Sequence, residues 1–129
     1  MKLGLITIVV HDYDEAIDFF VNTLGFNLNK NVVITSKKRW VIVRPPQGDA
    51  GVLLAKATNP EQKAIVGNQA GGRVCFFLYV KNFDETYEKF LSRNVCFIET
   101  PRSETYGRVT VFLDLYGNKW DLIENTDGQ

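Results

Sequence analysis

The feature that most constrains the fold of this chain is an internal repeat. The segments VVHDYDEAIDFFVN (9–22) and YVKNFDETYEKFLS (79–92) align without a gap at a spacing of 70 residues. Asp14 then matches Asp84, and most apolar positions coincide. Each segment follows a near-continuous apolar run of strand length. Similarity at a fixed spacing indicates that one supersecondary unit occurs twice in the chain.

Each copy predicts a helix that begins at a capping residue. Asp12 and Asn82 occupy the expected N-cap positions, with Glu15 and Glu85 at capping-box spacing after them. Apolar residues then recur at the 3.6-residue period of a helix with one buried face. Gly25 is expected to end the first helix as a left-handed residue just beyond its last turn.

Three short β-branched and aromatic runs, separated by turn signals, follow each predicted helix. Each copy therefore has the order β-α-β-β-β. The fold class predicted is α+β, with two βαβββ modules in tandem at 1–57 and 72–125. The linker between them, 58–71, carries one short helix with Pro60 near its start and Gly67 near its end. A chain of 129 residues is expected to form a single domain from these modules.

Composition excludes several classes of function. The formal net charge is zero, whereas nucleic-acid binding favours a basic excess. No apolar run approaches the roughly 18 residues that a membrane helix needs. Cys75 and Cys96 lie in apolar runs, which predicts two buried thiols rather than a disulfide framework, and hence a cytoplasmic protein.

Three motifs carry a resemblance to a known family: V-x-D-x-D-x-A-x-x-F at 10–19, LGF at 24–26 and DLYGNKWDLIE at 114–124. Together they resemble the vicinal oxygen chelate superfamily of glyoxalase I, bleomycin-resistance proteins, fosfomycin-resistance enzymes and extradiol dioxygenases. The resemblance implies two cupped mixed sheets around a cavity, in a glyoxalase-like homodimer. It does not fix the function, because this superfamily holds both enzymes and binding proteins on one scaffold.

The resemblance also implies where a metal would be held, on the first and last strands of each half. Those positions are Leu5, Leu54, Cys75 and Asp121. Because divalent metals need about three or four donor groups and leucine has none, we expect neither the usual metal site nor another cofactor. A divalent metal in a displaced site remains the alternative. His11, the only histidine, is expected to be a loop residue at a helix entrance.

Period-2 alternation predicts which strand residues line the cavity. Arg73, Cys75, Phe77 and Tyr79 share one face in this pattern and form a candidate ligand-binding set. Arg73 offers a planar guanidinium for a carboxylate or phosphate, or else serves as a surface residue or a partner of Asp121. Asp121, on an apolar strand, is the candidate catalytic residue, as a general base.

Two further pairs are candidate ligand-binding residues. Arg39 and Trp40 stand at a strand start, where they would stack on a ring or clamp an anion. A rim or dimer contact explains Trp40 equally well. Glu104 and Tyr106 belong to a polar hairpin loop, which either covers the cavity or is simply solvated.

The leading hypothesis is a protein that binds a small neutral or anionic organic molecule between the modules, without the usual metal. The alternative is a lyase, isomerase or dioxygenase of the same superfamily that uses an atypical metal site. A third hypothesis is an interaction protein whose cavity is filled by side chains. The expected partners are a small molecule and a second copy of the chain, with no nucleic acid and no membrane.

Overall fold

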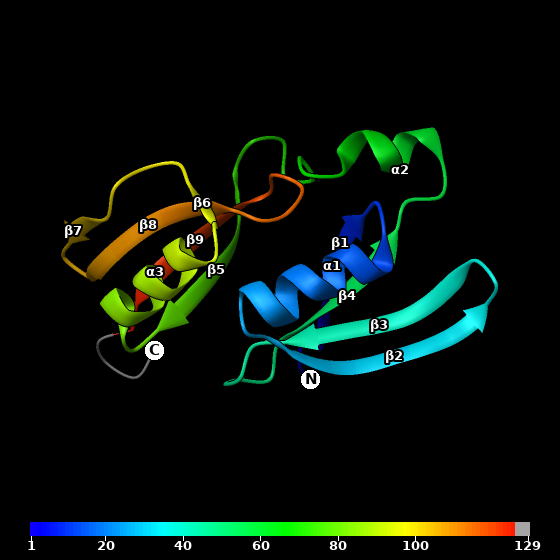
Figure 1. Cartoon of the computed structure of the whole chain (residues 1–129), viewed down its shortest axis with the longest axis horizontal. Coiled ribbons are helices and arrows are strands. Elements are labelled where there is room, and N and C mark those ends of the chain that lie inside the picture. Colours follow the sequence, from blue (N-terminus) through cyan, green and yellow to red (C-terminus); the bar gives the residue numbers. More distant parts are fainter. Residues whose placement is uncertain (126–129) are drawn as a thin grey trace. The chain divides into compact units, whose positions relative to one another are not determined.

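The predicted repeat corresponds to two units, each built on its own β-sheet (Figure 1). The computed structural model describes residues 1–125. Unit 1 covers Met1–Gln69, and unit 2 begins at Ala70. Both sheets are mixed, which confirms the predicted α+β class.

Unit 1 has a four-stranded sheet in the order β1-β4-β3-β2. Strand β1 runs parallel to β4, and the other neighbours are antiparallel. The long strand β2 lies at one edge, and all its residues are exposed. The elements are β1 (Leu5–Val10), α1 (Tyr13–Asp18), a π-helical segment η1 (Phe19–Thr23), β2 (Asn27–Thr35), β3 (Lys38–Arg44), β4 (Gly51–Lys56) and α2 (Pro60–Ile65).

Unit 2 repeats this order with one change. Its sheet runs β5-β9-β8-β6, and β7 also pairs with β8. The elements are β5 (Val74–Val80), α3 (Phe83–Ser92), β6 (Cys96–Phe97), β7 (Arg102–Glu104), β8 (Gly107–Leu113) and β9 (Lys119–Glu124). The second strand of the predicted module is thus split into β6 and β7. Pro101 lies in the break, where its missing N–H cannot contribute to a strand ladder.

The helix starts follow the predictions only in part. The Asp12 carboxylate accepts the Glu15 N–H at 2.8 Å, so the first cap is confirmed. The helix then continues as the wider π-helical turn η1. The helical segment ends at Gly25, whose φ of 85° is the predicted left-handed conformation. Asn82 occupies the predicted N-cap position of α3, but its side chain makes no capping bond, and its backbone is not in the extended conformation of Asp12.

Each sheet has one face covered by its own helix. In unit 2, Phe90 of α3 lies edge-on to Phe112, and Phe112 stacks on Trp120. In unit 1, Ile8 and its in-register partner Leu54 are fully buried. The predicted position of Leu54 in a cavity is therefore wrong, because the residue belongs to the core.

A buried carboxylate organises the turn between β8 and β9. Asp114 accepts the backbone N–H groups of Tyr116, Gly117 and Asn118, together with the Asn118 amide and the Trp120 indole N–H. This network explains the DLYGNKW motif at the end of the second copy. It places β9 beside β8 with Trp120 turned into the core.

Two smaller predictions have mixed outcomes. The short linker helix α2 begins at Pro60 and ends before Gly67, as expected. Cys75 is only half-buried and Cys96 is exposed, so the predicted burial of Cys96 is wrong. The reason is that β6 is a two-residue strand at a sheet edge. Within residues 1–125, no helix is long and apolar enough to cross a membrane.

Candidate functional site

The face of the unit 2 sheet opposite α3, here called the open face, carries the main candidate site. Phe77 and Tyr79 alternate along β5, and both are exposed, by 57% and 48%. Asp121 on β9 lies directly across from Phe77 in the ladder. Cross-strand neighbours in register share a face, so these three side chains stand together. Large exposed aromatic side chains beside a carboxyl group are suited to contact an organic ring.

The environment of Asp121 favours its protonated form. Burial, the main cause, raises the pKa of the Asp121 carboxyl above its ordinary value. Glu99 raises this pKa further, while Arg102 lowers it. The carboxyl group can therefore donate a hydrogen bond at a higher pH than an exposed aspartate can. Asp121 is half-buried, and its predicted role as a general base stays a prediction.

Arg102 is a candidate residue that sequence reasoning did not assign to this face. It pairs in register with Val109, which in turn pairs with Ile123 beside Tyr79, so it belongs to the open face. Its guanidinium forms ion pairs with Glu99 and, at 2.9 Å, with Glu104.

The hydrogen bond to Glu104 is the main cause of a raised pKa of Arg102, and a hydrogen bond that Arg102 donates to the Tyr106 hydroxyl adds to it. The structure therefore brings Glu104 and Tyr106 together around an arginine rather than leaving them as separate loop residues. In the sequence, the spacing of Arg102 and Glu104 two residues apart beside a hairpin turn was the pattern that could have indicated a common face.

Arg73 and Cys75 do not extend this face as predicted. The pairing of β5 with β9 passes from Val74 to Phe76, which leaves Cys75 at a bulge. A bulge breaks the alternation from which the common face was inferred. Arg73 is exposed in the turn before β5, and Arg102 is the arginine whose charge acts on the Asp121 carboxyl.

The Cys75 thiol is a poor nucleophile in this position. Burial is the main cause of its raised pKa, and the negative charge of Asp114 adds to it. Because the thiolate is the reactive form, a raised pKa lowers reactivity at neutral pH.

Arg39 contacts the first turn of α1. Its guanidinium lies 4.7 Å from the centre of the Tyr13 ring and pairs with the Asp14 carboxylate at 2.9 Å. Trp40 follows it on β3 and, with an exposure of 38%, points to the opposite face. The two side chains therefore lie on opposite faces of β3, and a ligand role for either one stays a prediction.

The same arginine contact occurs in unit 2. Arg108, near the start of β8, lies 4.9 Å from the centre of the Phe83 ring and forms an ion pair with Asp84. Phe83 and Asp84 are the repeat partners of Tyr13 and Asp14. The repeat therefore extends from the sequence to a tertiary contact in which an arginine holds the first turn of each helix.

The residues at the expected metal positions do not fit a metal ion. Leu53, rather than Leu54, occupies the position in unit 1 that corresponds to Asp121, since it pairs with Thr7 as Asp121 pairs with Phe77. The correction leaves the donor set unchanged, because both residues are leucines. Within residues 1–125, no three His, Cys, Asp or Glu side chains are grouped as metal ligands would be.

The arrangement of the helices and strands by itself defines the class of the protein. Two β-α-β-β-β units, each with a first strand parallel to its last, are the architecture of glyoxalase-like proteins. The chain belongs to the Glyoxalase/Bleomycin resistance protein/Dioxygenase superfamily, whose family model matches residues 2–122.

Individual relatives agree with this assignment. An uncharacterized protein of Shewanella frigidimarina is 49% identical over 127 residues, covering 96% of this chain and 93% of its own. TnmS3, an antibiotic binding protein from Streptomyces sp. CB03234, has a similar structure with a TM-score of 0.80 and 25% identity, covering 98% of this chain and 97% of its own. A superfamily member from Sphaerobacter thermophilus has a TM-score of 0.74 and 30% identity, covering 97% and 98%.

Proposed function

We propose that the protein binds a small neutral or anionic organic molecule on the open face of the unit 2 sheet. The observation that carries this proposal is the pair of exposed aromatic side chains, Phe77 and Tyr79, beside the half-buried carboxyl of Asp121. Exposed apolar groups that adjoin a few fixed polar groups are typical of small-molecule sites.

The chemistry of the face suits such a ligand. The aromatic rings offer apolar contact area, and burial of each ring against a ligand contributes favourable free energy. The Asp121 carboxyl can hydrogen-bond to a polar group of the ligand, while Arg102 attracts an anionic group. The antibiotic binding described for TnmS3 supports the proposal by similarity of fold.

We further propose that binding needs no metal ion and no other cofactor. The leucines at positions 5 and 53 supply no donor atom, so Cys75 and Asp121 would have to hold an ion without them. A stoichiometric metal in the purified protein, whose removal abolishes activity, would instead favour a lyase, isomerase or dioxygenase with a displaced metal site.

A thermal-shift screen over small carboxylates, aromatic compounds and thiol conjugates tests the proposed site. Compounds that stabilise the protein should lose most of their shift in Phe77→Ala and Asp121→Ala. The control is Leu91→Ala, which removes a side chain of similar exposure, 42%, on α3. Shifts that persist in both site variants would discard the site. Elemental analysis of the same preparation tests the metal-free state.

We also propose that the protein is a cytoplasmic homodimer. The edge strand β2 exposes three consecutive apolar residues, Val32, Val33 and Ile34, a feature that favours pairing with another chain. Light scattering coupled to size-exclusion chromatography should give twice the 14.7 kDa mass of the chain. A monomer at high protein concentration would contradict the dimer, and cell fractionation tests the compartment.

A further inference from the structure

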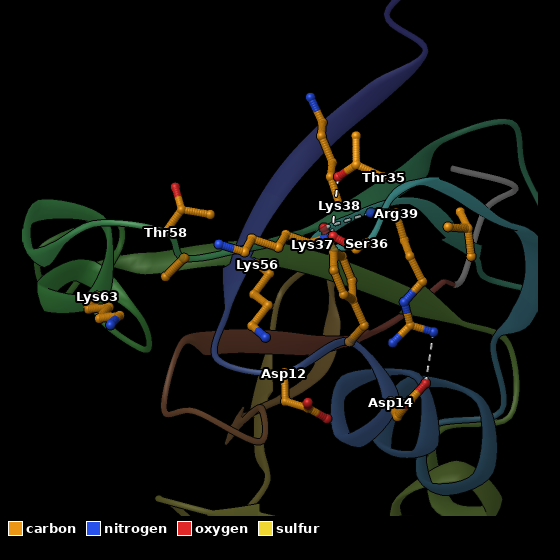
Figure 2. A pocket seen from close by; sticks show the side chains of 13 residues that line it. Asp12, Asp14, Thr35, Ser36, Lys37, Lys38, Arg39, Lys56, Thr58 and Lys63 are labelled. Atoms are coloured by element: carbon orange, nitrogen blue, oxygen red, sulfur yellow. Dashed lines mark hydrogen bonds and ion pairs between the residues drawn. The ribbon is translucent and has the colours of Figure 1, made fainter.

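Unit 1 contains a second feature that the proposed site does not use, a hollow with a volume of about 640 Å³ (Figure 2). We call it the basic hollow. Its cationic side chains come from the β2–β3 turn, the start of β3, the end of β4 and the helix α2, and Figure 2 shows the Lys38 side chain pointing away from those of Lys37 and Lys56. These cationic residues are Lys37, Lys38, Arg39, Lys56 and Lys63.

The charge of the basic hollow is strongly positive. It holds five of the fifteen lysines and arginines of a chain whose formal net charge is zero. Two carboxylates, Asp12 and Asp14, also line it, but both are engaged: Asp12 caps α1, and Asp14 pairs with Arg39. The ion pairs seen within residues 1–125 involve none of the four lysines.

The fold itself does not require these lysines. Lys56 ends β4 opposite Val10, and the corresponding last residue of β9, opposite Val80, is Glu124. The Glu124 carboxylate accepts the Arg108 N–H, which is a structural contact. The repeat thus places a negative charge in unit 2 where unit 1 has a positive one. At this position the positive charge is therefore a property of unit 1 alone.

We propose that the basic hollow binds an anionic small molecule that carries a phosphate or pyrophosphate group. Several ammonium groups around one concave surface attract a multiply charged anion, and the hydroxyl groups of Thr35 and Ser36 on the same lining offer donors. Its volume is in the usual range for small-molecule sites. The Tyr13 ring and Val33 add apolar contact for an organic part.

Isothermal titration with pyrophosphate at low ionic strength tests this proposal, with inorganic phosphate as a weaker comparison. The variant Lys37→Ala/Lys56→Ala removes two charges from the basic hollow. The control Lys81→Ala/Lys89→Ala removes the same charge from unit 2. We expect the first variant to weaken binding about tenfold or more, which is about 1.4 kcal/mol, and the control to weaken it less than about twofold. All four lysines are exposed, so circular dichroism should show unchanged folding.

Four outcomes would overturn the proposal. Equal weakening by both variants would mean diffuse attraction by net charge, and no measurable binding by the wild-type protein would mean no site. Binding to anionic lipid vesicles, with no binding of pyrophosphate, would assign the surface to a membrane instead. A loss of binding in Phe77→Ala would place the anion at the proposed site of unit 2, so the two proposals fail separately.

Discussion

The buried carboxylate of Asp114 offers a sharp test of how the second unit is held together. Asp114 is 5% exposed and accepts five hydrogen bonds of 3.0 to 3.1 Å. The change Asp114→Ala removes every acceptor at once. The donors of Tyr116 and Gly117 lie in a turn that water can reach, whereas Asn118 and Trp120 are each 3% exposed.

The magnitude follows from the three donors that those two buried residues provide. Hydrogen bonds to a charged group contribute about 1.5–3 kcal/mol each, and an unsatisfied buried donor costs about 1–3 kcal/mol. Because the five bonds share one carboxylate, their contributions do not add. We expect Asp114→Ala to lower the free energy of unfolding by about 3–5 kcal/mol, as for other broken buried networks.

A second variant separates the two oxygens. In Asp114→Asn, the remaining oxygen can still accept the three backbone N–H groups, all of which bond to Oδ1. The new amide replaces Oδ2 and points a donor at the donors of Asn118 and Trp120. The loss should be smaller than for alanine, about 2–3 kcal/mol.

Urea unfolding monitored by circular dichroism measures these losses, and the indole N–H resonance of Trp120 reports the broken bond directly. Asp49→Ala, an exposed loop change, is the control and should stay within about 0.5 kcal/mol of wild type. A loss below about 1 kcal/mol for Asp114→Ala would refute the reasoning, as would an unshifted indole resonance in both variants.

Three further predictions concern other parts of the chain. The Gln69 side-chain amide donates to the Thr7 carbonyl and accepts the Val9 N–H along the edge strand β1. Gln69→Ala should therefore lower the free energy of unfolding by about 1–2 kcal/mol and speed hydrogen exchange at the Val9 amide. An unchanged exchange rate would contradict this prediction. The raised pKa of Asp121 means that the folded state holds this proton more tightly than the unfolded state does. The stability that the bound proton contributes is full below the ordinary pKa of about 3.9. It is lost as the pH rises through the higher pKa of the folded state. Asp121→Asn should therefore stabilise the protein at neutral pH but not in acid, and urea midpoints that change equally at both would refute the assignment. Arg108→Ala should cost about 1 kcal/mol in low salt, because an exposed ion pair and a cation–π contact are both modest, and added salt should reduce the difference.

Much of the architecture was predictable because its signals are local. The cap at Asp12 and the end at Gly25 each depend on a few consecutive residues, and the 70-residue repeat carried the order of elements from one unit to the other. The same repeat failed at Asn82, where the residue type was right but the backbone conformation was not. Capping depends on dihedral angles that the residue type only favours.

The candidate site was less predictable, because its geometry depends on strand pairing. Alternation along single strands predicted that Phe77, Tyr79 and Asp121 share a face. The bulge at Cys75 interrupts this alternation at the start of β5. Arg102 reaches the same face only through the pairing of β7 with β8.

The sequence by itself determined the repeat, the α+β order of elements and the leucines that cannot hold a metal, since these are properties of residue type and spacing. Only the tertiary structure decided that Arg39 holds a helix, that Arg102 acts on Asp121, and that four lysines from separate elements surround one hollow. Those contacts join residues far apart in the chain, and strand register together with chain reversal at turns sets which of them meet.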